Sequence, residues 1–563
     1  MKHVLRRTAF FFRYAWLFSL FVNLAMLTLP LYMLQVYDRV LASRSLPTLA
    51  MLTLGAAFVY AVYVGLEMLR SRVLVQASVA LDRLLGAQVL GEVFARAAQP
   101  LGERHAGAVR DVATLRQYVT GSGLFAFFDA PWSLVFLAII FAIHPWLGAT
   151  ALLGMLVLLA LALADERRTR PLLLQANALA RQAGRDADAA VRQAEAVEAM
   201  GMRAAVVARW SARNDEVLRA QSQASDRSGS IVATSKGLRQ LLQVAMLGLG
   251  AYLVITQHLS AGTMIAATIL LARATAPLEL AIAGWRGFVD ARAAYARLAA
   301  LVDRAPSAAA ALELPAPRGA VEVDRIVVAP VADRPPVLKG VSFDVAAGEC
   351  VAVIGPSAAG KSTLLRALLG LWRPQSGCVR LDGADVADWP RESLAPHVGY
   401  LPQDVELLAG TVAENIARMG PMPQSSQAVV AAATLAGAHE MILKLPGGYD
   451  TVIGDAATVL SGGQRQRIGL ARALFGPPKF VVLDEPNSNL DTDGEAALMA
   501  AIRALKAMGS TVVFVTHKPS LLADADRVLV LHAGSVAAFG PRDEVLAKVS
   551  GRPVRDAQPA TAT

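Results

Sequence analysis

A glycine-rich run that ends in lysine and serine is the segment of this sequence best suited to chemistry. It fits the pattern G-x-x-x-x-G-K-[ST], and Thr363 follows directly after it: Gly355, Pro356, Ser357, Ala358, Ala359, Gly360, Lys361 and Ser362. Glycines let backbone N–H groups wrap phosphate oxygens at a helix N-terminus, the Lys361 ammonium offsets β- and γ-phosphate charge, and the Ser362 hydroxyl can bind Mg²⁺. The run therefore predicts a P-loop that binds ATP and Mg²⁺ through these residues, and a glycine turn by chance is the alternative.

An acidic pair follows a short apolar run. Phe480 to Leu483 predicts a buried strand that leads into Asp484 and Glu485, about 120 residues after Lys361. Open α/β sheets bind ligands at the carboxyl ends of their strands, so the pair is expected at a binding edge. Asp484 suits Mg²⁺, directly or through water, and Glu485 suits a catalytic base that orients the attacking water. Such a pair is weak evidence alone, but after a P-loop it predicts ATP hydrolysis.

The elements around these residues alternate between strands and helices. Strand patterns at 349–355, 479–486, 510–517 and 527–534 are separated by helical patterns such as 361–372. This alternation predicts an α/β P-loop nucleotide-binding domain with a largely parallel core sheet, over residues 321–563. The only two cysteines, Cys350 and Cys378, both lie in this half, which indicates a reduced, cytosolic domain without a disulfide framework.

The first half of the chain is far more apolar. Hydrophobic residues make up 55% of the whole chain, and about 20 apolar residues suffice to cross a bilayer as a helix. Six runs of that kind predict a membrane domain over residues 1–303: Tyr14–Leu34, Leu46–Leu69, Leu124–Ile143, Trp146–Ala164, Leu238–Ile255 and Leu259–Leu280. The segment 178–210 has helical patterning, so the helices are expected to continue beyond the membrane into the cytoplasm.

Basic residues predict the orientation of these spans. Arg is dense in the long segments 70–121 and 165–236, whereas the turns at 144–145 and 257–258 carry no Arg or Lys. Basic residues also flank both ends of the membrane domain: Lys2, Arg6, Arg7 and Arg13 before it, and Arg286, Arg292 and Arg297 after it. Both termini and the nucleotide-binding domain are therefore expected in the cytoplasm, because positive charge favours that side. Only the first outer loop, with Arg39 and Arg44, is mixed.

Three ionisable residues lie in or near the spans, namely Asp129, Arg273 and Glu279. Such residues are costly in lipid, so they are candidates for a transport pathway or a buried pair. The favoured interpretation is that each lies near a helix end or in a cytoplasmic extension.

Residues 304–320 separate the two halves. The segment is rich in Ala and Pro and has no periodicity, so it is interpreted as a linker. The formal net charge of +9 raises the question of nucleic acid, but the Arg residues are spread along the chain rather than gathered in one stripe. No nucleic-acid partner is therefore expected.

The run from Leu460 to Arg467 decides among P-loop families. Its Ser461, Gly462, Gly463 and Gln464 resemble the signature motif of ATP-binding cassette proteins, and the resemblance covers the whole soluble half. In that family the signature binds the γ-phosphate held by the opposite cassette, so one P-loop and one signature per chain imply a homodimer. The resemblance also assigns a Q-loop glutamine that binds nucleotide and metal, a D-loop aspartate and a switch histidine with a catalytic role: Gln403, Asp491 and His517. A lone Gln or His is more often a structural hydrogen-bonding residue.

The cassette departs from that family at one position. Exporter cassettes usually carry an aromatic residue about two dozen positions before the P-loop lysine, to stack on adenine, and residues 325–340 contain none. Looser base selectivity, or apolar contact with Val328 or the prolines, is expected in its place.

The membrane half resembles the six-helix ABC exporter fold, and two stretches are more specific. Residues 29–49 and 127–148 resemble the permease/ATPase subunit of type I protein secretion systems, and residues 195–202 resemble its second coupling region. The alternative is that Tyr37, Trp132 and Trp146 are ordinary interfacial anchors.

This resemblance implies a multi-pass protein of the bacterial inner membrane that exports unprocessed proteins with a C-terminal signal. It further implies a periplasmic membrane-fusion adaptor, an outer-membrane channel and contact with membrane lipid. About a dozen residues precede the first span and contain no cysteine, so cleavage of leader peptides by this chain is not expected. The alternative function is a homodimeric exporter of lipids or small molecules with the same fold.

Overall fold

The computed structural model describes residues 2–99, 107–303, 314–330, 335–420, 426–454 and 460–550. The chain divides into two compact units. One comprises Met1–Phe94 with His105–Ala305, and the other comprises Ala95–Arg104 with Pro306–Thr563. Much of the predicted linker, residues 304–313, lies outside the described residues.

The first unit is entirely helical where it is described. Its helices are α1 (Lys2–Ala25), α2 (Thr28–Gln35), η1 (Val36–Val40), α3 (Leu41–Ser43), α4 (Leu46–Ala97), α5 (Ala108–Thr120), α6 (Ser122–Ile143), α7 (Pro145–Arg192), α8 (Ala194–Ala199), α9 (Arg203–Ile255) and α10 (Ala261–Val302). Within the described residues, six helical stretches are long and apolar enough to cross a membrane, which confirms the predicted number of spans.

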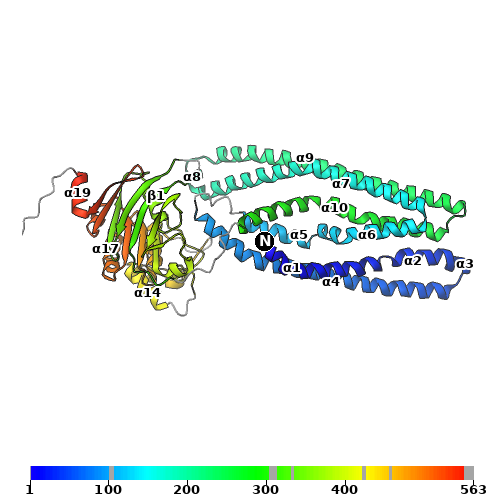
Figure 1. The fold of residues 1–563 in the computed structure, drawn as a ribbon, viewed down its shortest axis with the longest axis horizontal. Coiled ribbons are helices and arrows are strands. Elements are labelled where there is room, and N and C mark those ends of the chain that lie inside the picture. The colour runs from blue at the N-terminus through cyan, green and yellow to red at the C-terminus, as the bar shows by residue number, and fades with distance from the viewer. Residues whose placement is uncertain are drawn as a thin grey trace, which may run out of the picture. The chain divides into compact units, whose positions relative to one another are not determined.

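Several helices are much longer than a bilayer requires. Helix α9 has 53 residues, or about 80 Å at 1.5 Å per residue, against about 30 Å of hydrocarbon. It runs beside α7 along most of its length (Figure 1). Close approach depends in part on Gly154 of α7, where a Cβ would lie 2.2 Å from a methyl carbon of Leu242 in α9. The predicted extension of the spans into longer helices is therefore present.

Local signals explain the turns between spans. Pro145 lies at the start of α7, where a backbone N–H would have no partner inside the helix, so proline costs no hydrogen bond there. The His144 side chain accepts a hydrogen bond from the Trp146 N–H. At the start of α10 the Ser260 hydroxyl accepts a hydrogen bond from the Thr263 N–H and caps the helix. Both turns fall where the sequence predicts a short loop.

The second unit contains the predicted α/β domain. Its strands are β1 (Val321–Val328), β2 (Leu338–Val345), β3 (Cys350–Ile354), β4 (Ser376–Leu381), β5 (Ala384–Asp385), β6 (Val398–Leu401), β7 (Gly410–Thr411), β8 (Val452–Ile453), β9 (Phe480–Asp484), β10 (Thr511–Val515), β11 (Arg527–His532) and β12 (Ser535–Pro541). Its helices are α11 (Lys361–Leu368), α12 (Arg391–Leu394), α13 (Val412–Ile416), α14 (Ser426–Leu435), α15 (His439–Leu443), α16 (Gly462–Leu474), α17 (Thr492–Ala507), α18 (Pro519–Leu522) and α19 (Arg542–Ser550).

The core sheet has the order β12-β11-β3-β10-β9-β6. All its pairings are parallel except the β11–β12 hairpin, which confirms the predicted parallel core. Strands β9 and β10 are buried along their whole length, as expected for strands covered on both faces. A second sheet, β2-β1-β4-β5, is antiparallel. The parallel order brings the carboxyl ends of β3, β10, β9 and β6 to one edge, where the candidate site lies.

Candidate nucleotide-binding site

The glycine-rich run forms a tight turn between β3 and α11. Gly355 has φ +154°, and a Cβ there would lie 2.2 Å from the Leu531 carbonyl oxygen, so the turn requires glycine. Gly360 also has a left-handed φ, +100°, immediately before α11. Lys361 is buried, and its Nζ donates to the carbonyl oxygens of Gly355 and Pro356 at 2.9 and 3.0 Å. The loop is therefore already curled around its lysine, with free N–H groups of the helix N-terminus at its mouth.

Asp484 ends β9 beside this loop and is 2% exposed. The Ser362 hydroxyl donates a hydrogen bond to its carboxylate, while burial raises the pKa of Asp484 above its ordinary value despite that bond. Its Oδ1 atom is buried and has no hydrogen-bond partner among the described residues. A buried carboxylate oxygen with a free lone pair next to a serine hydroxyl fits the hard oxygen ligands that Mg²⁺ prefers. Ser362 and Asp484 therefore lie where a P-loop metal would need them.

Glu485 follows Asp484 in a left-handed conformation, with φ +48°. Gln403 Nε2 lies 3.3 Å from one of its carboxylate oxygens, and His517 Nε2 lies 3.5 Å from the other. Gln403 follows β6 and His517 follows β10, the two neighbours of β9 in the sheet. Three residues predicted from separate motifs are thus brought together because their strands are adjacent and parallel. A carboxylate held between two polar side chains is suited to orient a water molecule.

The signature run begins helix α16. Ser461 is the N-cap, and it forms a capping box with Gln464, in which each side chain accepts from the other residue's N–H. Gly463 packs closely against the D-loop, since a Cβ there would lie 2.9 Å from the Asn489 carbonyl oxygen. Among the described residues, no hydrogen bond or ion pair joins Ser461–Gln464 to the P-loop of the same chain. The signature residues therefore lie at the N-terminus of α16, where backbone N–H groups can bind an anion.

Gln466 connects the signature helix to the acidic pair, a role that the sequence motifs did not indicate. The side chain is 1% exposed, and its Nε2 donates to the carbonyl oxygens of Pro486 and Glu485 at 2.9 and 3.4 Å. Its Oε1 accepts from Asn489 Nδ2 at 3.2 Å. Gln466 differs from the polar residues beside it only in being buried. Because three-dimensional packing decides that burial, the sequence held no signal for this role.

Asp491 caps the next helix rather than lying beside Lys361. Its carboxylate accepts from the Gly494 N–H at 2.9 Å and from Arg467 Nη2 at 2.5 Å. These bonds, first the backbone bond and then the arginine, lower the pKa of Asp491. The residue therefore fixes the start of α17, directly after the D-loop.

The prediction that Val328 contacts adenine is wrong. Val328 is 2% exposed and belongs to the core beneath β1, because alternate side chains of this strand point inward. Val337 lies closer to the P-loop, 3.3 Å from the position of a Cβ on Gly360. Pro335 is exposed and Pro336 is half-buried, while residues 331–334 lie outside the described residues.

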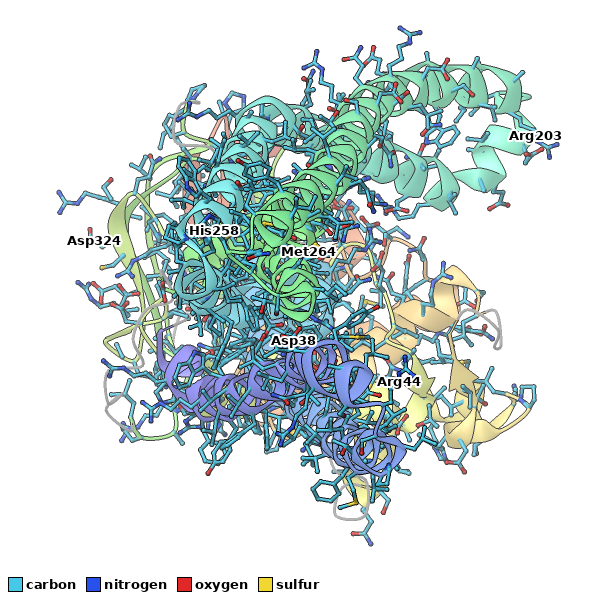
Figure 2. All side chains as sticks on the ribbon, turned by 90° about the vertical axis from the view of Figure 1, so that its right-hand side faces the viewer. Asp38, Arg44, Arg203, His258, Met264 and Asp324 are labelled. Atoms are coloured by element: carbon cyan, nitrogen blue, oxygen red, sulfur yellow. The ribbon has the colours of Figure 1, made fainter. Side chains whose placement is uncertain are left out.

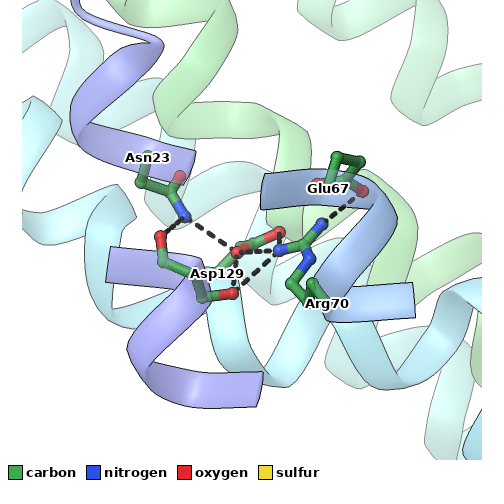
Figure 3. Close-up of polar contacts among 5 residues, drawn as sticks. Asn23, Glu67, Arg70 and Asp129 are labelled. Atoms are coloured by element: carbon green, nitrogen blue, oxygen red, sulfur yellow. Dashed lines mark hydrogen bonds and ion pairs between the residues drawn. The ribbon is translucent and has the colours of Figure 1, made fainter. Parts of the chain in front are cut away.

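Asp129 and Glu279, two of the three ionisable residues in or near the spans, each pair with an arginine of a neighbouring helix, as the alternative of a pair expected; Figure 3 shows the cluster around Asp129. Asp129 of α6 accepts from Ser19 and Asn23 of α1 at 2.9 and 2.8 Å, and it pairs with Arg70 of α4 at 3.1 Å. Arg70, only 4% exposed, also pairs with Glu67 at 2.7 Å. Glu279 of α10 pairs with Arg239 of α9 at 2.6 Å. The physical reason is that a charge between apolar helices is stabilised most by an opposite charge on a neighbouring helix.

Comparison with known proteins gives matches along the whole chain. A family model described as "ABC transporter" matches residues 338–488, and one described as "ABC transporter transmembrane region" matches residues 12–278. Type I secretion system ATP-binding protein PrsD of Rhizobium meliloti (strain 1021) is 45% identical over 535 residues, which cover 94% of this chain and 91% of that protein.

More distant matches also span both units. Leukotoxin translocation ATP-binding protein LktB of Mannheimia haemolytica is 31% identical over 95% of this chain and 76% of its own length. A solved structure of a bacterial Atm1-family ABC exporter with ATP bound matches with a TM-score of 0.84 and 25% identity, over 99% of this chain and 100% of that chain.

Proposed function

Because this chain belongs to the ABC transporter family, among its type I secretion ATP-binding proteins, we propose that it is the inner-membrane ATPase of a type I protein secretion system. Its cargo would be unprocessed proteins with a C-terminal signal. The observation that carries this proposal is the 45% identity to PrsD over 94% of the chain, since it includes the membrane unit as well as the cassette. The chain is a multi-pass membrane protein and an ATPase coupled to transport.

The site residues have distinct proposed roles in ATP hydrolysis. Lys361 would exchange its two carbonyl partners for β- and γ-phosphate oxygens, and the backbone N–H groups at the start of α11, including those of Ser362 and Thr363, would hold the rest of the triphosphate. Ser362, Asp484 and Gln403 would hold Mg²⁺, which supplies charge neutralisation between the phosphates. Glu485 would orient the attacking water and accept its proton, with His517 next to the same carboxylate.

A homodimer is part of the proposal. Ser461, Gly462 and Gly463 lie at a helix N-terminus that suits a phosphate, yet among the described residues they form no hydrogen bond with the P-loop of their own chain. A second copy would place each signature opposite the other copy's nucleotide. The periplasmic adaptor and outer-membrane channel belong to the same proposal, with the cassette in the cytoplasm and lipid around the apolar helices.

The rival candidate is an exporter of lipids or small molecules, because the exporter fold that this chain shares with the Atm1-family structure does not by itself specify a protein cargo. Deletion of the gene, followed by comparison of secreted proteins and membrane lipids, separates the two candidates. Loss of one or a few large extracellular proteins, restored by the wild-type chain, supports secretion. A changed lipid composition with an unchanged set of secreted proteins would favour the rival.

Replacement of Glu485 by Gln tests the proposed chemistry. The expected result is retained ATP binding, a trapped closed dimer and ATP turnover lower by about 10² to 10⁴, the usual contribution of a general base. An Arg503→Ala variant, which breaks an exposed ion pair on the same domain, serves as the control. Undiminished turnover in the Glu485→Gln variant would remove Glu485 from the catalytic role.

A further inference from the structure

One carboxylate ties the loop after the first span to the start of the last span. Asp38 lies in η1, where its Oδ1 accepts from the Gly262 N–H at 3.0 Å and its Oδ2 accepts from the Ser260 hydroxyl at 2.5 Å. The two partners are more than 220 positions away in the chain. Figure 2 looks onto this end of the unit and shows Asp38 between the blue helices of the first hairpin and the green helix that carries Met264.

The start of α10 has both the space and the hydrogen-bond donors that the Asp38 carboxylate needs. A Cβ on Gly262 would lie 2.5 Å from Asp38 Oδ1, so any larger residue at this position would displace the carboxylate. The first N–H groups of α10 have no partner inside the helix, and the partial positive charge there attracts an anion. Ser260 accepts from the Thr263 N–H while donating to Asp38, so a single hydroxyl serves both the helix and the carboxylate.

The contact of Asp38 with Ser260 and Gly262 lies in the loops at the end of the spans rather than between the middle parts of the helices. The chain reverses direction at Arg44 and at Gln257, both in left-handed conformations, and the bonds of Asp38 to Ser260 and Gly262 place the two loops at the same end of the spans. This is the predicted outer end. Directly beside the contact, Leu259 packs against an apolar core that it shares with Leu27. The bonds of Asp38 are formed by polar groups, namely the Ser260 hydroxyl and the Gly262 N–H, whose hydrogen bonds water can replace.

We propose that Asp38, Ser260 and Gly262 form a latch that holds the outer end of the transport pathway closed, and that this latch opens in each ATP-driven cycle. The inference rests on the proposed export function, because a polypeptide can leave only if the outer ends of the spans separate. Asp38 acts as a positioning residue that sets the resting state of the outer end. It lies in the 29–49 stretch that resembles secretion subunits, which gives that stretch a physical role.

The test measures a distance across the latch in the full chain, reconstituted in lipid nanodiscs. Nitroxides are attached to Arg44→Cys and Gln257→Cys, both exposed, in a Cys378→Ser background. Pulsed electron spin resonance then compares the nucleotide-free chain with a Glu485→Gln version holding ATP and Mg²⁺. We expect a short distance without nucleotide and a longer one with it. If the distance between the two nitroxides is the same in both states, the contact of Asp38 does not open during the cycle, and the proposed latch is refuted.

Variants of the latch sharpen the test. Asp38→Ala removes both bonds and should raise the ratio of long to short distances without nucleotide by about tenfold or more. Asp38→Asn keeps one acceptor but loses the charge, and should raise it about two- to fivefold. Gly262→Ala excludes the carboxylate and should match Asp38→Ala, which keeps the test valid if one variant misfolds. Asp82→Ala, at an exposed ion pair in the same unit, is the control.

An unchanged ratio in both Asp38→Ala and Gly262→Ala would refute the proposal. The readout involves no cargo, so it separates failure of the latch from failure of the secretion function. If the distances change as expected while deletion of the chain leaves the secreted proteins intact, only the proposed function is lost.

Discussion

Replacing Asp129 by Ala removes the acceptor at the centre of a polar cluster that joins α1, α4 and α6. Three donors lose a bond: the Ser19 hydroxyl at 2.9 Å, Asn23 Nδ2 at 2.8 Å and Arg70 Nη1 at 3.1 Å. At about 0.6 kcal/mol for an average bond inside a membrane protein, the loss is about 2 kcal/mol. Breaking a buried ion pair sets an upper figure of about 5 kcal/mol. Because Arg70 keeps Glu67 and Ser19 as partners, we expect a value near the middle, about 3 kcal/mol.

Equilibrium unfolding of the purified chain in mixed micelles, followed by tryptophan fluorescence, measures this loss. Asp82→Ala is a matched control, because its ion pair with Arg116 is exposed on both sides and should contribute at most about 1 kcal/mol. The combined Arg70→Met and Asp129→Leu variant should recover part of the loss, since it leaves no unpaired charge. If Asp129→Ala is no less stable than Asp82→Ala, the cluster does not stabilise the membrane unit and the reasoning is refuted.

Two further predictions concern the cassette. Gln466→Ala should lower the maximal rate of ATP hydrolysis about tenfold without a matching change in nucleotide affinity, because the side chain fixes the carbonyl oxygens of Glu485 and Pro486. Steady-state kinetics over a range of ATP concentrations measures both quantities. An unchanged maximal rate would contradict this role of Gln466. Burial raises the pKa of the Cys350 thiol to about 12, so the folded chain should resist alkylation there between pH 7 and pH 9 while half-buried Cys378 reacts. Mass spectrometry after iodoacetamide treatment measures each site, and modification of Cys350 at the rate of Cys378 would contradict its burial.

Motifs and elements that depend only on residues close together in the sequence were predictable. The P-loop, the acidic pair and the signature each depend on neighbours within about ten positions, and the strands that carry them are short apolar runs. Gln403 and His517 were assigned by resemblance one at a time, and the structure brings them to Glu485 because parallel strands present their carboxyl ends at one edge. Six apolar runs were enough to predict six spans.

Partners that are distant in the chain were not predictable. The partners of Asp129 lie 59 to 110 positions away in the chain, so the sequence named a buried pair only as an alternative and could not identify its members. Val328 was misassigned because an apolar residue in a strand faces either the core or a ligand, and only the sheet pairing decides which. The roles of Gln466 and Asp38 are likewise set by residues that packing alone brings to them.

The bonds of Gln466 have a consequence for the timing of the ATPase. In the proposed homodimer, Glu485 acts on the nucleotide of its own cassette, whereas the signature at the start of α16 contacts the nucleotide of the other. Gln466 lies on α16 and holds the backbone of Glu485, so in that homodimer one buried amide would link the two nucleotide sites. Occupancy of one site would thereby adjust the catalytic base of the second, which makes hydrolysis a cooperative function of ATP concentration rather than the sum of two independent reactions.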